Sequence, residues 1–238
     1  MPKVSKEYFE SKRKIILDAA LKVFSKKPSY TVSMKDIIKE SKLSQGGVYK
    51  YYSNIDDIII SLINENKIEV NPKDIIKDNY NNPKKVIFEF LKEFKNYFFE
   101  SHNEYGKIFF ELYPILINDK KRLKKYASKT NSMNHPRNWF KELFIYLDKK
   151  TKENYFNPIA KLSDIYAQII STLYGMGEEL ILTKYYNKKI NYIIDLKGEY
   201  GIDFETKLDD LVEIVYKTIL FLMGSEELNK KVKNKKLK

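Results

Sequence analysis

Apolar residues recur at three- and four-residue spacing along most of this chain, and this period constrains the fold more than any other feature. Among 238 residues only 8 are Gly and 7 are Pro, so few positions interrupt a helix. The pattern therefore predicts an all-α protein. We expect helices at residues 6–25, 34–41, 45–52, 55–67, 73–80, 84–101, 104–117, 119–130, 136–150, 158–187 and 205–224.

The predicted helices fall into three parts. Residues 1–66 hold one longer helix and three short ones, and we expect them to form a separate N-terminal domain. Residues 67–228 are expected to form a larger helical domain, in which residues 188–204 connect the last two helices. The strand-like run 192–194 has no second strand to pair with. Residues 229–238 are expected to be a disordered basic tail.

Several classes of protein are not expected from this composition. The chain has no cysteine, which excludes disulfides, thiolate metal sites and a cysteine nucleophile and favours a reducing cytoplasm. We expect neither export nor a membrane span, because the longest apolar run, 58–63, is far shorter than the roughly 20 residues that a bilayer requires.

Motifs for catalysis or for cofactors are also missing. The two histidines, His102 and His135, lie far apart without a carboxylate pair at ligand spacing, so no metal site is expected. Gly175-Met176-Gly177 begins like a dinucleotide motif but follows no strand, and close helix packing explains it better. We therefore expect no cofactor and no enzymatic activity.

The net charge of +12 is unevenly distributed. Residues 1–66 carry 12 basic and 8 acidic side chains, whereas 229–238 carry 6 lysines and no acid. Such an excess can indicate a nucleic-acid partner. The alternative is codon bias, since 41 of the 44 basic residues are Lys. Deletion of the tail is expected to flatten the salt dependence of nonspecific DNA binding without changing sequence preference.

Two short helices with capping signals follow the first helix. Ser33 and Asp36 form a capping-box pattern, and Ser44 can cap the next helix. Leu43 places an apolar side chain in the polar break between them. This spacing is typical of a helix-turn-helix, predicted here at about 33–52 and followed by a linking helix at 55–67.

The same region resembles the TetR family of bacterial transcription regulators, over about residues 13–63. The family's opening pattern, Arg-x-x-Ile-x-x-Ala-Ala-x-x-x-Phe, is matched by Arg13, Ile16, Ala19, Ala20 and Phe24. A second pattern, Ser/Thr-x-x-Asp-Ile, is matched by Ser33, Asp36 and Ile37. The third, an aliphatic residue followed by Tyr-x-Tyr-Phe, is matched by Val48-Tyr49-Lys50-Tyr51-Tyr52. Beyond residue 66 the resemblance is only architectural. It implies an N-terminal DNA-binding domain and a helical domain for ligand binding and dimerisation, with homodimer contacts through 158–187 and 205–224.

The chain departs from the family pattern at three places. Lys42 stands where a turn glycine is usual, so we expect the preceding residue pair to make the bend without glycine's freedom at positive φ. Ile55 replaces a lysine that supports a phosphate contact, so one backbone contact is expected to be lost. The adjacent Gly46 and Gly47 predict a loosely held first turn in the recognition helix.

The chemistry of the side chains assigns roles in DNA binding. Gln45 and Lys50 suit readout of adenine and guanine edges, and Gly46 and Gly47 permit a close approach to the groove. The resemblance places Tyr52 at the family's Phe position, so it is expected in the core. Hydroxyl or ammonium contacts to phosphates are expected from Ser33, Lys35, Ser44, Tyr49 and Tyr51, although Tyr49 and Tyr51 can also serve in packing.

Residues 88–176 are rich in aromatic side chains, and the resemblance places an effector pocket in this region. Tyr hydroxyls and a Trp suit a largely apolar ligand with a few polar groups, whereas core packing is the alternative for each residue. The basic run 120–125 could face an acidic effector, but a solvated helix face is the favoured interpretation. The candidate ligand residues are Phe88, Tyr105, Phe109, Tyr113, Trp139, Tyr166 and Tyr174.

The resulting hypothesis is a repressor that binds a palindromic operator as a homodimer and is released by a small, largely apolar effector. One alternative is a DNA-binding factor of the same fold that responds to no ligand or to a protein partner. A helical enzyme or small-molecule carrier is a further alternative.

Overall fold

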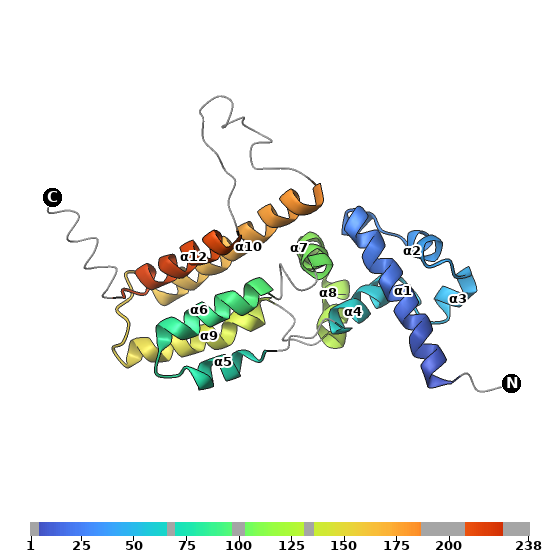
Figure 1. Cartoon of the computed structure of the whole chain (residues 1–238). Coiled ribbons are helices and arrows are strands. Elements are labelled where there is room, and N and C mark those ends of the chain that lie inside the picture. Colours follow the sequence, from blue (N-terminus) through green and yellow to red (C-terminus); the bar gives the residue numbers. More distant parts are fainter. Residues whose placement is uncertain (1–4, 66–69, 97–102, 131–135, 187–207, 226–238) are drawn as a thin grey trace, which may run out of the picture. The chain divides into compact units, whose positions relative to one another are not determined.

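The structure is a computed structural model that describes residues 5–65, 70–96, 103–130, 136–186 and 208–225. Within these ranges the secondary structure is helical, without strands (Figure 1). The elements are α1 (Lys6–Lys26), the 3₁₀ turn η1 (Ser29–Thr31), α2 (Met34–Ser41), α3 (Gln45–Tyr49), α4 (Ile55–Glu65), α5 (Pro72–Asp78), α6 (Pro83–Lys95), α7 (Asn103–Asn118), α8 (Lys120–Lys129), α9 (Pro136–Lys152), α10 (Leu162–Tyr186) and α12 (Leu208–Leu222).

The all-α prediction is confirmed, and the largest differences at helix ends within the described ranges are those of α3 and α10. Helix α3 ends at Tyr49 and not at residue 52. Helix α10 begins at Leu162 rather than at 158, because the segment before it packs against the end of α12, where the Ile159 N–H donates to the Leu222 carbonyl at 3.0 Å. Predictions about 188–204, 229–238, His102 and His135 fall outside the described residues.

The chain folds into two compact units. Unit 1 comprises residues 1–67 and 102–134, and unit 2 comprises 68–101 and 135–238. Helices α7 and α8 therefore pack with α1–α4, although the sequence analysis assigned them to a single domain at 67–228. Apolar periodicity shows that a helix buries one face but does not show which helices cover it.

The core of unit 1 joins helices that are distant in sequence. Along α1 the buried positions Ile16, Ala20 and Phe24 recur every four residues, as one face of a helix requires. They share one apolar cluster with Ile58 of α4 and Leu112 of α7. Helix α7 also packs on η1, so it covers the turn between α1 and α2.

Unit 2 is built around aromatic side chains of α6 and α9. The Phe90 and Trp139 rings meet edge to face at 6.0 Å, and the Phe94 and Phe140 rings do so at 5.0 Å. Helices α10 and α12 pack on each other, and α12 also packs on α6 (Figure 1).

A glycine ends α12. Gly224 has φ +70°, and the N–H of the next residue, Ser225, donates to the Leu220 carbonyl, as in a Schellman motif. A Cβ atom at Gly224 would lie 1.7 Å from the Asn157 carbonyl oxygen, so the close approach of the 157–159 segment requires glycine.

The described residues form neither a membrane span nor a metal site. None of the helices in the described ranges is long and apolar enough to cross a membrane. Among the same residues, no group of three or more His, Asp or Glu side chains is arranged to hold a metal ion.

Candidate nucleic-acid interface

The capping box at the start of α2 is formed as predicted. The Ser33 Oγ accepts the Asp36 N–H at 3.4 Å, and the Asp36 carboxylate accepts the Ser33 N–H at 3.0 Å. Lys27 also donates to this carboxylate. Hydrogen bonds from Lys27 and then from Ser33 lower the pKa of Asp36 to about 2. The first turn of α2 is therefore fixed by interactions that require an ionised Asp36.

The turn between α2 and α3 differs from the sequence-based expectation. Lys42 itself adopts the left-handed conformation, with φ 57° and ψ 19°, at the C-cap of α2. A residue with a Cβ pays roughly 1–2 kcal/mol in this region, which is why glycine is common there. The bend is thus made at Lys42 with some strain, and the half-buried Leu43 follows directly.

Helix α3 has one buried anchor and an exposed face. Val48 is fully buried, while Gln45, Tyr49 and Lys50 are exposed. The Ser44 Oγ accepts the Gly47 N–H at 3.1 Å and so caps the helix. Burial of one residue per turn fixes the rotation of this short helix, because no other rotation would bury Val48.

The two glycines of α3 have different surroundings. A Cβ atom at Gly46 would meet nothing within 4 Å, so the backbone there is open on its outer side. A Cβ atom at Gly47 would lie 3.0 Å from the capping Ser44 Oγ. The Ser44 cap therefore accounts for glycine at 47 and partly offsets the loose first turn that two glycines predict.

The tyrosines after α3 occupy different environments. Tyr52 is only 4% exposed, and its hydroxyl accepts a hydrogen bond from Arg13 Nε at 3.2 Å, which agrees with the expectation of a core position. Tyr51 is half-buried, with its ring 4.6 Å from that of Phe9 in α1. The contact between Phe9 and Tyr51 ties the first helix to the end of the helix-turn-helix.

The nine predicted DNA contacts lie at the start of α2 and on or beside α3. Gly47 and Tyr51 are half-buried, and the other seven are exposed: Ser33, Lys35, Ser44, Gln45, Gly46, Tyr49 and Lys50. The hydroxyls of Ser33 and Ser44 also serve as helix caps, so their substitution would change the local fold as well as any contact.

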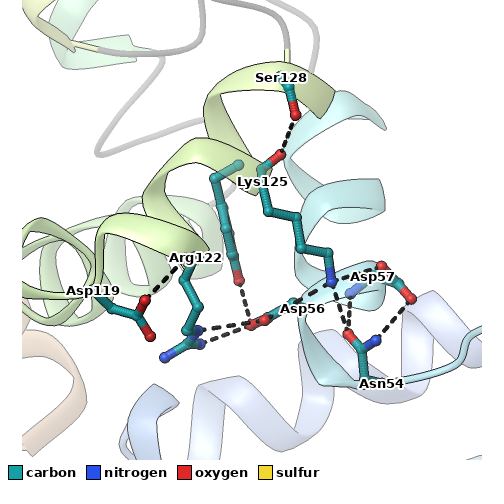
Figure 2. A network of polar contacts seen from close by, with 8 residues as sticks. Asn54, Asp56, Asp57, Asp119, Arg122, Lys125 and Ser128 are labelled. Carbon is teal, nitrogen blue, oxygen red and sulfur yellow. Dashed lines mark hydrogen bonds and ion pairs between the residues drawn. The ribbon is translucent and has the colours of Figure 1, made fainter.

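A network of charged groups links the first turn of α4 to α8 (Figure 2). The Asp56 Oδ1 accepts hydrogen bonds from Arg122 Nη2 at 2.7 Å and from the Tyr126 hydroxyl at 3.0 Å. Lys125 Nζ lies 2.9 Å from Asp57 Oδ1. Two cations of the basic run 120–125 therefore pair within unit 1. Sequence reasoning missed these pairs because nothing local connects residues 66 positions apart.

A second charged group ties α7 to the turn after α1. Lys107 is 1% exposed, and its Nζ donates to the Lys27 carbonyl at 2.7 Å and to Glu111 Oε2 at 2.9 Å. The Ser29 N–H also donates to Glu111 Oε2, at 2.7 Å. Burial lowers the pKa of Lys107 although Glu111 opposes the shift. The spacing of Lys107 and Glu111, four residues apart on a helix, is the only local signal of this pair.

The candidate ligand residues are divided between the units. Tyr105, Phe109 and Tyr113 belong to unit 1. Phe88, Trp139, Tyr166 and Tyr174 belong to unit 2. Neither unit by itself brings all seven together, so a shared role in one pocket stays a prediction.

Three of the residues in unit 2 show what each can offer a ligand. Phe88 is 43% exposed and meets Tyr216 edge to face at 5.6 Å. The Tyr166 hydroxyl donates to the Phe144 carbonyl at 3.0 Å, and burial raises its pKa to about 12. Trp139 is 1% exposed, and its indole N–H finds no hydrogen-bond partner among the described residues.

Taken together, α1–α4 form a helix-turn-helix domain whose third helix projects an exposed polar face. The profile of the family described as bacterial regulatory proteins, tetR family, matches residues 16–62. Residues 16–62 are therefore similar to the DNA-binding region of the tetR family. Known members are transcriptional regulators and not enzymes.

Curated relatives match over the same region. An uncharacterized HTH-type transcriptional regulator, YfiR of Bacillus subtilis, is 40% identical over 62 residues, which cover 26% of this chain and 30% of that protein. The regulator HbdR of Aromatoleum sp. is 40% identical over 50 residues, which cover 21% of this chain and 22% of that protein. The chain therefore spans less than a third of the length of these relatives.

Solved structures match over most of the chain. The hemolysin II transcriptional regulator HlyIIR is similar at a TM-score of 0.55 and 17% identity, over 91% of this chain and 99% of that one. A TetR-family structure from Syntrophomonas wolfei gives a TM-score of 0.53 at 16% identity, over 91% and 97% of the two chains. At this identity the likeness extends to the fold alone.

Proposed function

We propose that this protein is a transcriptional repressor that binds a palindromic DNA operator through α3. The observation that carries the proposal is the exposed face of α3, held in one rotation by the buried Val48 and the Ser44 cap. Gln45 and Lys50 would read base edges in the major groove. Phosphate contacts are assigned to Ser33, Lys35, Ser44, Tyr49 and Tyr51. The open backbone of Gly46, with Gly47 beside it, is assigned a close approach to the groove.

A palindromic site implies a twofold symmetric protein, and we assign the homodimer contacts to residues 158–187 and 205–224. Exposed apolar side chains support this assignment, because Ile214 is 57% exposed and Phe221 is 40% exposed on the outer side of α12. On the adjacent α10, Gly175 is exposed and leaves open space where a partner helix could approach closely. A dimer would bury both surfaces.

We assign release from the operator to a small, largely apolar effector. The unpaired indole N–H of Trp139 supports an effector with a hydrogen-bond acceptor, because a buried donor without a partner is costly. The alternative is a factor that responds to no ligand. The edge-to-face contacts of Trp139 with Phe90 and of Phe140 with Phe94 favour it, because these rings already fill the core.

The DNA assignment is tested by selecting bound duplexes from a random pool with the full-length protein. Lys50→Ala should weaken binding to the selected duplex by roughly 5- to 150-fold, in line with a loss of about 1–3 kcal/mol for a base contact. Tyr49→Ala should also weaken it, through the loss of a phosphate contact. Lys22→Ala is the control, because Lys22 is an exposed lysine of the same unit on α1. Equal effects of the three variants would count against a role for α3.

The effector assignment needs a separate experiment. Small molecules are screened for a rise in melting temperature, and the hits are added to the complex with the selected duplex. A compound that both stabilises the protein and weakens DNA binding supports the repressor. If no compound does both, the ligand-independent alternative is favoured.

A further inference from the structure

The first turn of α4 lies close to the end of α3 along the chain. Five residue steps separate Lys50 from Ile55, a span of at most about 18 Å. The major groove is about 12 Å wide and is bordered by the two phosphate backbones. Phosphates therefore lie on both sides of α3 when this helix is inserted into the groove. The first turn of α4 is therefore within reach of the DNA backbone if the proposed function is correct.

This turn carries two carboxylates, Asp56 and Asp57. Acidic residues suit a helix N-terminus, but beside phosphates they would repel the ligand. No basic residue occurs in α4 to offset them, since Ile55–Glu65 reads IDDIIISLINE. Any positive charge at this place must come from another element.

Helix α8 supplies that charge. Arg122 Nη2 lies 2.7 Å from Asp56 Oδ1, and Lys125 Nζ lies 2.9 Å from Asp57 Oδ1 and 3.9 Å from Asp56 Oδ2. Lys125 Nζ also donates to the Asn54 Oδ1 at 3.1 Å, immediately before α4 begins. Two positive charges thus meet two negative charges at the helix start (Figure 2).

Hydrogen bonds fix the members of this network in place. The Asn54 side chain accepts the Asp57 N–H and donates to the Asp57 carboxylate, both at 3.1 Å. On α8, the Asp119 side chain accepts the Arg122 N–H at 3.0 Å. Burial raises the pKa of Asp56, but hydrogen bonds from Arg122 and Tyr126 outweigh it and lower the pKa below its ordinary value.

The basic side chains of the run on α8 point in two directions. Arg122 and Lys125 have side chains 32% and 28% exposed and point to α4, whereas Lys121 and Lys124 are exposed. Neighbouring lysines on one helix therefore differ in their contacts while carrying the same charge. Lys124 provides a matched control for Lys125.

We propose that Arg122 and Lys125 are positioning residues for DNA binding. They hold the first turn of α4 against α8 and neutralise the carboxylates that this turn would otherwise present to DNA phosphates. The inference rests on the proposed function, because it concerns the same DNA-binding surface. It assigns to α8 a part in recognition although α8 lies outside the helix-turn-helix.

The test uses the full-length protein and two probes, a random-sequence 30-base-pair duplex and the selected duplex. Lys125→Met should weaken binding to both about tenfold, as expected when carboxylates near phosphates lose their counter-charge. Lys124→Met should change binding less than threefold. Adding Asp57→Asn to Lys125→Met should restore binding to within about threefold of the wild type, because the uncompensated carboxylate is gone.

The outcomes distinguish a failure of the proposed function from a failure of the positioning role. If wild-type protein binds neither probe, the proposed function fails. If it binds but Lys125→Met and Lys124→Met weaken binding equally, or if Asp57→Asn gives no rescue, the positioning role is overturned and general attraction or a direct phosphate contact replaces it. Circular dichroism confirms folding at the binding temperature. If Lys125→Met does not fold, Lys125→Gln keeps a donor toward Asn54 and makes the same test.

Discussion

Each of the two compact units is stabilised internally by a different kind of interaction. In unit 1, α7 and α8 are attached to α1–α4 by buried and half-buried charged groups as well as by apolar contacts. In unit 2, the described core is mainly apolar and aromatic, and Lys150 is its buried charged residue. Hydrogen-bonded charges fix one geometry, whereas apolar cores tolerate repacking. A helix that reads DNA needs the first property, and a domain that adapts to an effector can use the second.

Breaking the buried pair on α7 should give the largest effect and would test the attachment of α7 in unit 1. Lys107→Met leaves the Glu111 carboxylate without its buried cation and should lower the free energy of unfolding by about 3–4 kcal/mol. Chemical denaturation monitored by circular dichroism measures the change.

A second substitution separates the charge from the packing. Glu111→Gln combined with Lys107→Met removes the buried negative charge and keeps an acceptor for the Ser29 N–H. The double variant should recover at least half of the lost stability. Additive losses from the two substitutions would show that the ion pair is not what couples α7 to the turn.

Gly224 tests whether unit 2 also has a position that accepts one geometry only. Gly224→Ala forces a Cβ against the Asn157 carbonyl and strains a positive φ, so it should cost about 3 kcal/mol. Gly175→Ala, measured on the monomeric protein, is the control, because a Cβ there meets nothing of the same chain within 4 Å, and it should stabilise the helix by about 1 kcal/mol. Similar melting temperatures for both variants would contradict the geometry of the α12 terminus.

A substitution at Lys42 should raise the stability of the protein, whereas Lys107→Met and Gly224→Ala lower it. Lys42→Gly relieves the left-handed strain in the turn of the helix-turn-helix and should stabilise unit 1 by about 1 kcal/mol. The stabilisation should appear in thermal unfolding. A destabilised variant would mean that the Lys42 side chain contributes more than its backbone costs.

The smallest expected effect concerns the capping box of α2. Because the folded pKa of Asp36 is about 2, below its usual value of 3.8, its contribution is present above about pH 4 and is lost as pH falls toward 2. Asp36→Asn should cost about 1 kcal/mol at pH 7 and flatten the stability curve between pH 4 and 2. Unchanged acid sensitivity would assign that region of the curve to other carboxylates.

Local sequence signals predicted unit 1 well where the interactions are local. Ser33, Asp36 and Ser44 specify their caps within three residues, and the family resemblance places Tyr52 in the core. The left-handed Lys42 could not be predicted, because glycine normally marks such a position. The same limit applies to the charge pairs of α4 with α8 and of α7 with the turn after α1, since these depend on tertiary packing.

The aromatic residues of unit 2 were predicted as a group but not in their individual roles. An apolar period identifies Trp139 and Phe140 as buried, yet it cannot distinguish a ring that fills the core from one that lines a pocket. The indole N–H of Trp139 becomes informative only when its surroundings are known, because tryptophan in a core usually finds an acceptor.

The central claim is that α3 enters the major groove of a palindromic operator as one half of a symmetric pair. Hydroxyl-radical footprinting of the full-length protein on the selected duplex tests it most directly. We predict two related protected half-sites with centres about 34–36 Å apart, and loss of both on Lys50→Ala. Protection without sequence preference or symmetry, or a footprint unchanged by Lys50→Ala, would contradict the account.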